Sequence, residues 1–204
     1  MFKDIVKSSR SWRGYDESRK VTLDELKELV DCARFAPSSV NRQPFMYYLA
    51  NEPEQLAVIQ PLTGWARALP EKGLPYPGKR PTAFIVICQN TQWEESVSRF
   101  QKDVGIVAQT MLLAAVEMGL GGIMIGNFSP EKISKALKLP SHLVPVLIVA
   151  IGKPDEEIVL TEARPGESLN YYRDENDVHY VPKRALEDVI ILKEKHNGKN
   201  HTEI

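Results

Sequence analysis

The chain has 204 residues, of which 43% are hydrophobic and 26% charged, so it is long enough to bury one sizeable core. Its formal net charge of -1 excludes the strongly basic surface that nucleic-acid binding requires. No apolar run approaches the roughly 20 residues of a membrane-spanning helix.

Two cysteines, Cys32 and Cys88, fall inside apolar patterns, and neither has a partner at metal-ligand spacing. We therefore expect reduced cysteines, a cytoplasmic location, and no metal, membrane or nucleic-acid partner. The length predicts a single domain over residues 1–192. The polar residues 193–204 are expected to form a C-terminal tail.

The first predicted helix covers residues 22–35. Thr22 and Glu25 have the spacing of a capping box, and apolar residues recur behind them at helical intervals. The helix must stop near residue 36, because Pro37 disfavours helical geometry in the residue before it. Residues 45–50 then predict a strand, and the continuous apolar run 83–88 predicts a buried one.

Residues 103–118 predict a helix that is apolar nearly all round. Such a helix lies either at the centre of a core or in a subunit interface. Residues 122–125 predict another strand. Ser129 and Pro130 then have the residue types of an N-cap and a first helical position, which predicts a short helix ending near residue 137.

The last predicted strand covers residues 144–152. Residues 154–183 are polar and are expected to be rich in loops, and a final apolar segment covers residues 186–192. Helices and strands therefore mix without a strict alternating repeat. This mixture favours an α+β fold over a doubly wound sheet.

Several familiar motifs fail on a decisive residue. The spacing of Gly73, Gly78 and Lys79 begins a phosphate-binding loop, but Arg80 stands where Ser or Thr must hold Mg²⁺. The glycines near residue 120 precede a strand, whereas those of a dinucleotide-binding turn follow one. The four histidines show no metal-ligand pairing.

Three segments combine polar chemistry with neighbouring apolar elements. In residues 9–15, Arg10 and Arg13 lie on either side of a hydroxyl, so two guanidiniums can converge on one anion. Residues 36–44 are dense in small donors and acceptors, which suit the edge of a flat heteroaromatic ring. Glycines in residues 119–128 let the backbone approach a ligand closely. Taken singly, each segment also fits an ordinary role as a solvated turn, loop or connection.

Taken together, the segments resemble the nitroreductase family of flavoproteins, over about residues 2–190. The resemblance rests on the order and spacing of five motifs: Arg-Ser-x-Arg at 10–13, Pro-Ser-x-x-Asn-x-Gln-Pro at 37–44, Gly-Leu-Gly at 119–121 followed by Ile-Gly, Gly-x-Pro at 152–154, and a basic segment at 181–189. It implies an α+β fold with a central, mostly antiparallel sheet flanked by helices. It also implies an intertwined homodimer that holds FMN non-covalently at its interface.

The resemblance assigns cofactor contacts to the residues of its motifs. The FMN phosphate would be bound by Arg10 and Ser11, with help from Lys183 and Arg184, while Arg13 would lie at the pyrimidine edge. The partner subunit would contribute Pro37, Ser38, Ser39 and Asn41, with Gln43 near the ring or ribityl chain. Met124, Ile125 and Gly126 would lie along the ring. Ser9 departs from the pattern, because the family usually has a basic residue there.

The implied activity is the reduction of small electron-poor acceptors, such as nitroaromatics or quinones, by NADH or NADPH in a ping-pong scheme. The flavin carries the chemistry, so no catalytic side chain is expected. Residues 65–80 are interpreted as a flap, with Trp65 and Tyr76 as substrate contacts, or else as an exposed connector. The alternatives are a specialised flavoprotein, dehalogenase-like or an enone reductase, and a non-catalytic flavin-binding protein.

Overall fold

The structure is a computed structural model that describes residues 1–192, so the predicted tail at 193–204 lies outside the described residues. The chain divides into two compact units, at residues 1–156 and from residue 157 onward. The single domain over residues 1–192 stays a prediction.

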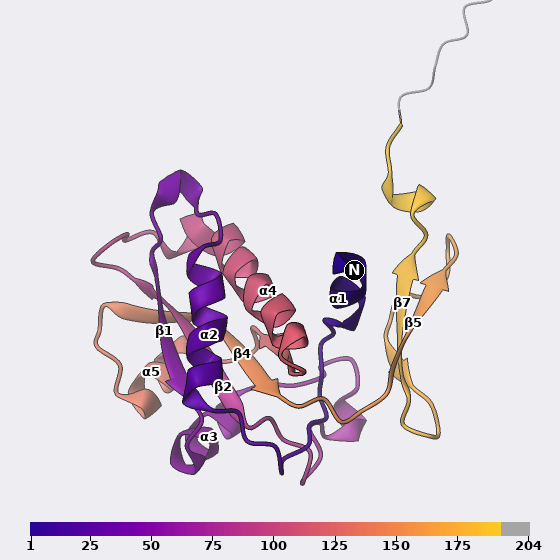
Figure 1. The fold of residues 1–204 in the computed structure, drawn as a ribbon, viewed down its shortest axis with the longest axis horizontal. Helices are drawn as coiled ribbons and strands as arrows, with labels where there is room; N and C mark the ends of the chain where they lie inside the picture. The colour runs from indigo at the N-terminus through magenta and orange to yellow at the C-terminus, as the bar shows by residue number, and fades with distance from the viewer. Residues whose placement is uncertain (193–204) are drawn as a thin grey trace, which may run out of the picture. The chain divides into compact units, whose positions relative to one another are not determined.

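The first unit is built on a four-stranded antiparallel sheet (Figure 1). Its strands lie in the order β1 (Phe45–Ala50), β2 (Ala83–Asn90), β4 (Leu143–Gly152) and β3 (Gly121–Ile125). Each pair is antiparallel. The four strands predicted in this unit are therefore confirmed, with ends that shift by no more than two residues. The expected α+β fold with a central antiparallel sheet is confirmed as well.

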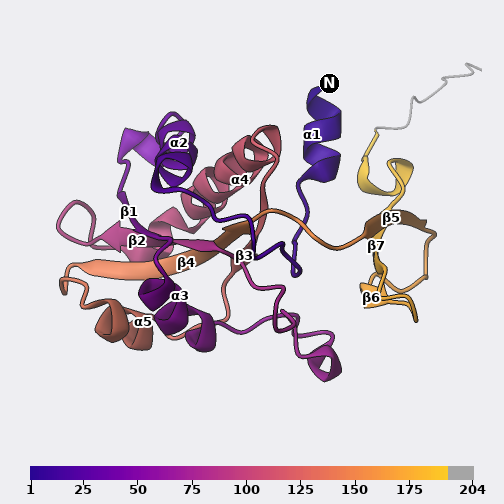
Figure 2. The ribbon, with the colours of Figure 1, turned by 60° about the horizontal axis from the view of Figure 1, so that its bottom comes forward.

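Helices cover both faces of this sheet, as Figure 2 shows. One face carries α2 (Leu23–Arg34) and α4 (Gln101–Glu117), and the other carries α3 (Pro53–Ile59) and α5 (Pro130–Leu137). Strand β2 contributes side chains to the hydrophobic cores on both faces of the sheet, because successive side chains of a strand point to opposite faces. Ile85 and Ile87 enter the core under α2 and α4, whereas Phe84 and Val86 enter the core on the other face.

Two of the helices, α3 and α1 (Phe2–Ser8), were not predicted from the sequence. Both are seven residues long and too short to show a clear apolar period, and α1 contains no buried residue. Short 3-10 turns complete the described elements: Ser39–Asn41, Gln60–Leu62, Pro70–Lys72, Val97–Phe100 and Glu187–Val189.

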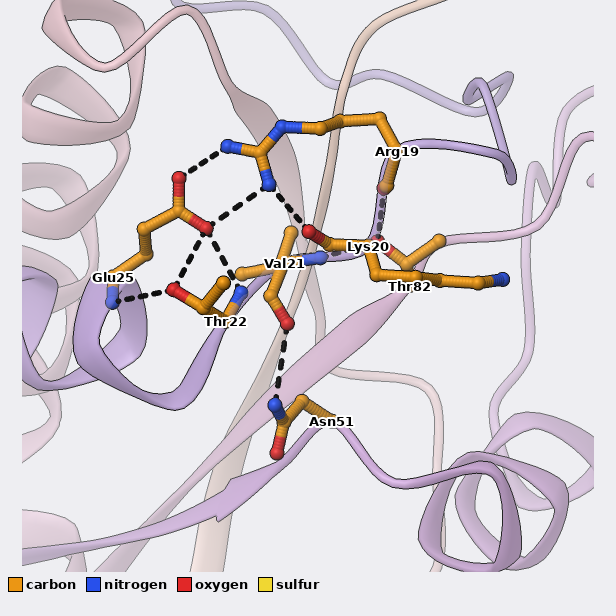
Figure 3. Close-up of polar contacts among 7 residues, drawn as sticks. All are labelled: Arg19, Lys20, Val21, Thr22, Glu25, Asn51 and Thr82. Carbon is orange, nitrogen blue, oxygen red and sulfur yellow. Dashed lines mark hydrogen bonds and ion pairs between the residues drawn. The ribbon is translucent and has the colours of Figure 1, made fainter.

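Helix α2 starts where the capping box predicts (Figure 3). The Thr22 hydroxyl accepts a hydrogen bond from the Glu25 amide at 3.2 Å, and the Glu25 carboxylate accepts one from the Thr22 amide at 2.8 Å. Arg19 forms an ion pair with the same carboxylate. The Asn51 side chain donates to the Val21 carbonyl at 3.2 Å, which ties the start of α2 to the end of β1.

Helix α4 is buried along one side only. Six of its apolar residues, from Val104 to Ala115, enter the core at helical spacing. Ile106 is 40% exposed, and Leu113 and Val116 are only partly buried. Burial on all sides within one chain, the first alternative for residues 103–118, is therefore wrong. The second alternative, a subunit interface, stays a prediction.

The second unit contains strands that were not predicted within residues 154–183, which were expected to be polar and rich in loops. It contains a three-stranded sheet in the order β5 (Ile158–Ala163), β7 (His179–Arg184) and β6 (Tyr172–Arg173). Strands β5 and β7 are parallel, and β6 is antiparallel to β7. These strands are too polar for a hydrophobic pattern to reveal them, and Pro182 within β7 argues against a strand in any reading of the sequence alone. The apolar segment 186–192 contains only a 3-10 turn and is largely exposed.

Candidate functional site

The Arg-Ser-x-Arg segment follows α1 and lies along the edge strand β3. Ser11 forms a bridge with Gly122, and the Trp12 amide donates to the Gly122 carbonyl at 3.2 Å. A side chain at position 121 would collide with the Trp12 ring, because an added Cβ there would lie 2.5 Å from it. The structure therefore brings the first and third motifs of the sequence together at one edge of the sheet.

Arg10 has a donor that the described residues leave unused. Its Nη2 donates to the Val6 carbonyl at 2.8 Å, at the end of α1. Its Nε is buried and has no acceptor among the described residues. Burial lowers the pKa of this guanidinium. A buried donor without an acceptor is costly, so the side chain fits a ligand that supplies anionic oxygens, such as a phosphate. The Ser11 side chain beside it is exposed.

Arg13 belongs to a buried charged cluster. It is 7% exposed, its Nη1 donates to the Ser11 carbonyl at 2.9 Å, and its amide donates to Glu156. Tyr15 is fully buried in the same cluster, and its hydroxyl donates to the Trp12 carbonyl at 2.8 Å. Burial and the nearby Glu156 carboxylate raise the pKa of Tyr15, and the Arg13 charge opposes them in part. Arg13 is thus a fixed cation close to β3.

The end of β3 is open on one side. Met124 is partly buried, Ile125 is 3% exposed, and Gly126 is exposed with no atom within 4 Å of an added Cβ. The chain then contacts the start of the predicted flap. The Gly64 amide donates to the Asn127 carbonyl at 2.7 Å. Trp65, two residues from a bridge between residues 63 and 128, therefore lies near the end of β3.

The predicted flap, residues 65–80, is partly packed and is not simply an exposed connector. Ala66, Leu69 and Leu74 are buried, and Tyr76 is partly buried. Trp65 is partly buried, and its indole Nε1 donates to the Thr63 hydroxyl at 2.8 Å. At its end, the carbonyl of residue 79 accepts a hydrogen bond from the Tyr15 amide at 3.1 Å. Both ends of the segment are thus tied to the surroundings of Arg13 and β3.

The Pro-Ser-Ser segment lies between α2 and β1. The hydroxyls of Ser38 and Ser39 both donate to Asp103, at 2.9 and 2.7 Å. The Gln43 side chain donates to the Asn41 side-chain oxygen at 2.9 Å, and both residues are exposed, as is Pro37. The serine hydroxyls are therefore occupied inside the chain, whereas Asn41 and Gln43 face outward.

One chain does not bring all the predicted contacts together. The 37–44 segment leads into β1, and the 10–13 segment lies beside β3, so the two groups belong to opposite edges of the sheet. Three inter-strand spacings of about 4.8 Å separate these edges, roughly 14 Å in total.

The remaining predicted contacts lie in the second unit. Lys183 and Arg184 end β7, opposite Glu162 and Ala163 of β5, and both are exposed. The structure thus puts these two basic side chains on a defined strand. Their part in binding the same ligand as Arg10 stays a prediction.

Sequence reasoning missed three polar residues that shape this region: Asp103, Glu156 and Tyr15. Asp103 is 2% exposed although it is charged. The sequence pattern that could have revealed it is an acidic residue in the first turn of an otherwise apolar helix. Such a carboxylate is expected to be buried, and a buried carboxylate needs hydrogen-bond donors. Glu156 and Tyr15 carried no comparable signal, because their contacts join the two ends of the first unit.

Within residues 1–192, no helix has the length and apolar character to cross a membrane. In the same residues, no three His, Cys, Asp or Glu side chains are grouped so as to hold a metal ion.

Comparison with known proteins points to one family. The profile of the nitroreductase family matches residues 6–153. An FMN reductase [NAD(P)H] from Bacillus subtilis is 26% identical over 191 residues, which is 82% of this chain and 73% of the relative. A nitroreductase family protein from Clostridium difficile 630 is 25% identical, with a TM-score of 0.61 over 75% of this chain and 84% of its own. An FMN-dependent nitroreductase from Clostridium difficile R20291 is 24% identical, with a TM-score of 0.60 over 75% of this chain and 87% of its own.

Proposed function

This chain belongs to the nitroreductase family, and from that premise we propose that it is an FMN-dependent oxidoreductase. It takes reducing equivalents from NADH or NADPH and passes them to small electron-poor acceptors such as nitroaromatics or quinones. The name of the Bacillus subtilis relative, an FMN reductase that uses NAD(P)H, supports the nicotinamide donor. The name of the FMN-dependent relative from Clostridium difficile R20291 agrees with the cofactor.

The observation that carries the proposal is the buried Nε of Arg10, which has no acceptor among the described residues and belongs to the segment that pairs with the start of β3. Arg10 and Ser11 would hold the FMN phosphate, because a guanidinium and a hydroxyl together offer the donors that phosphate oxygens accept. Lys183 and Arg184 would assist them. Those two lie outside the part of the chain that the family profile matches, so their role rests on the basic motif alone.

When bound, FMN supplies the redox chemistry, and the residues around it position and tune it. Arg13 would lie at the pyrimidine edge of the flavin ring. A fixed cation there stabilises the negative charge that reduction creates at that edge more than it stabilises the neutral oxidised ring. Arg13 therefore raises the reduction potential. Ile125 and Gly126, with Met124, would lie along the ring, where the exposed glycine allows close approach.

We also propose a homodimer, in which the 37–44 segment of one copy completes the site of the other. Two observations support it. The predicted contacts lie on opposite edges of one sheet, and α4 leaves Ile106 exposed and Leu113 only partly buried. Pro37, Ser38, Ser39, Asn41 and Gln43 would thus belong to the partner's FMN. Nicotinamide and acceptor would occupy one pocket in turn, which gives ping-pong kinetics.

Trp65 and Tyr76 would contact the nicotinamide or the acceptor, since the flap is joined to the end of β3. Shortening the flap between its buried anchors Leu69 and Leu74 should change acceptor preference and leave FMN content unchanged. Unaltered preference would refute the role of the flap. A cytoplasmic location is proposed as well, because both cysteines are free thiols.

The direct test uses the purified protein. It should be yellow with about one FMN per chain, sediment as a dimer, and be bleached by NADH or NADPH in the absence of oxygen. A yellow protein that neither nicotinamide bleaches would refute the oxidoreductase proposal and favour flavin storage. A colourless protein that cannot be reconstituted with FMN would refute flavin binding altogether.

A further inference from the structure

A single buried carboxylate lies beneath the 37–44 segment. Asp103, in the first turn of α4, is 2% exposed. Its Oδ2 accepts hydrogen bonds from the Ser38 hydroxyl at 2.9 Å and from the Ser39 amide at 2.7 Å, and its Oδ1 accepts one from the Ser39 hydroxyl at 2.7 Å. Both carboxylate oxygens therefore bind the segment, although it lies more than 60 residues away in the sequence.

Asp103 is also linked, through Ser38, to the C-terminal end of the same turn at Gln43. The Gln43 amide donates to the Ser38 hydroxyl oxygen at 3.0 Å, while that hydroxyl donates to Asp103. A chain of hydrogen bonds thus runs from the Gln43 backbone through Ser38 to the carboxylate. One buried charge fixes both ends of the turn.

The turn between these ends has an unfavourable backbone. Val40, Asn41 and Gln43 have φ angles of 47°, 53° and 49°, in the left-handed region that residues with a side chain rarely adopt. Val40 is the least suited to it, because its side chain is β-branched. Val40 is also 74% exposed, so its own packing does not compensate for the strain. The conformation must therefore be maintained by contacts on the buried side, and strain of this kind is frequent at ligand-binding sites.

A second anchor beneath the segment is weaker. Arg42 and Arg99 lie 3.7 and 3.8 Å from the Glu94 carboxylate, and both arginine side chains are more than half exposed. Exposed ion pairs of this length contribute little. Asp103 is therefore the principal contact that holds the turn.

We propose that Asp103 is a positioning residue of the FMN site, which keeps the 38–43 turn in the conformation that presents Asn41 and Gln43 to the cofactor of the partner subunit. This inference rests on the proposed function. We assign Asp103 no proton transfer in the reaction, because both its carboxylate oxygens accept hydrogen bonds from the serines and the residue is only 2% exposed. It acts through the serines alone.

The charge state of Asp103 agrees with this role. Burial acts to raise its pKa, but the hydrogen bonds from Ser39 and Ser38 outweigh burial and leave the pKa below its ordinary value. The carboxylate is therefore ionised at neutral pH. The anchoring is fully present above the ordinary carboxyl pKa and is lost as the pH falls through the lower, folded-state value.

The test begins with protein free of FMN. Amide hydrogen exchange at Ser39 and Gln43 would be compared in the wild type, Asp103→Ala and Asp103→Asn, after correction for intrinsic exchange rates. Glu117→Gln is the matched control, since it removes the same charge from the exposed far end of α4. Exchange at both amides should rise at least about tenfold in Asp103→Ala, as loss of one hydrogen bond of about 1.4 kcal/mol requires. Asp103→Asn should be intermediate because it retains an acceptor oxygen.

FMN binding is measured next. Its Kd should rise roughly tenfold or more in Asp103→Ala and stay unchanged in Glu117→Gln. On the acid side, exchange at Ser39 should rise in the wild type and not in Asp103→Asn, which has no group to protonate. Should Asp103→Ala fail to fold, Ser39→Ala removes one of the three hydrogen bonds to the same carboxylate and should also raise exchange at Gln43.

The outcomes separate the two proposals. Unchanged exchange at Ser39 and Gln43 in Asp103→Ala would overturn the anchoring, whatever the protein binds. Loosened exchange with an unchanged FMN Kd would overturn the positioning role. A wild-type protein that binds no FMN at all would refute the proposed function instead, and Asp103 would then have no cofactor to position.

Discussion

Replacing Arg10 with alanine should weaken FMN binding more than any other single change in the first unit. The guanidinium carries five N–H donors, of which one is given to the Val6 carbonyl. The buried Nε and a neighbouring terminal nitrogen can then form a paired contact with phosphate oxygens. A hydrogen bond to a charged group contributes roughly 1.5–3 kcal/mol.

The lower end of that range applies, because Arg10 is only half-buried and solvent screens its charge. Two bonds then amount to about 3 kcal/mol, and the Kd for FMN should rise about 100-fold. Arg10→Lys keeps the charge but loses the planar pair of donors, so an intermediate Kd is expected. The loss of FMN affinity caused by Arg10→Ala should be smaller at high salt, because salt screens the attraction between the guanidinium and the phosphate.

The assay is a titration of FMN fluorescence with cofactor-free protein at low and high salt. Arg34→Ala serves as the control, because it removes an exposed arginine whose partner is Asp31 on α2. A circular dichroism spectrum would show whether loss of the contact with Val6 has unfolded α1. A Kd for Arg10→Ala within about twofold of the wild type would refute the assignment of Arg10 to the phosphate, since such a ratio is far below one charged hydrogen bond.

Three further predictions concern the same unit. Arg13→Gln should lower the flavin reduction potential, measured by equilibrium reduction with a reference dye, because the cation at the pyrimidine edge is lost. Gly122→Ala should reduce the free energy of urea unfolding by about 2–3 kcal/mol, because its Cβ would lie 2.3 Å from a backbone oxygen, whereas Gly126→Ala should be neutral. Cys32 should react slowly with a thiol reagent at pH 8, and Cys88 only after unfolding, since burial raises the pKa of Cys88 to about 12 and leaves it 1% exposed.

Each of these predictions has a clear opposite result. An unchanged potential in Arg13→Gln would place that guanidinium away from the flavin edge. Equal stability of Gly122→Ala and Gly126→Ala would mean that β3 moves aside at no cost. Labelling of Cys88 in the native protein as fast as that of Cys32 would contradict the burial of β2.

The local elements of the first unit could be predicted because their causes are local. The cap of α2 depends on Thr22 and Glu25, three residues apart, and the start of α5 depends on Ser129 and its neighbouring proline. Strand β2 was evident because its first six residues, which are buried on both faces, are all apolar. In each case the stabilising contact lies within a few residues of the pattern that reveals it.

The second unit could not be predicted for the opposite reason. Strand β5 pairs with β7 across a connection of 15 residues, and parallel pairing needs such a long connection. The register matches Thr161 with Pro182 and Glu162 with Lys183, so no apolar alternation marks either strand. Polar strands of this kind are stabilised by pairing with another strand, so the sequence of one strand alone does not reveal them.

The candidate site was predictable in its parts but not in its internal contacts. The order of the motifs anticipated two polar segments and the glycine-rich strand, and the structure places the 10–13 segment beside β3. Nothing in the sequence indicates that the hydroxyls of Ser38 and Ser39 turn inward to a carboxylate that lies 65 and 64 residues further along the chain. Contacts at such separations depend on the completed fold, in which α4 packs against α2.

The placement of β1 and β3 at opposite edges has a genetic consequence for a paired molecule. Each copy then contributes residues to two separate sites, so a substitution at one of these residues affects only one of the two sites for each altered chain. A chain altered at Arg10 and a chain altered at Asn41 together form one site that carries both defects and one site that carries neither. In the proposed homodimer, inactive alleles of these two kinds would therefore complement each other in a cell, whereas two alleles with the same defect would not.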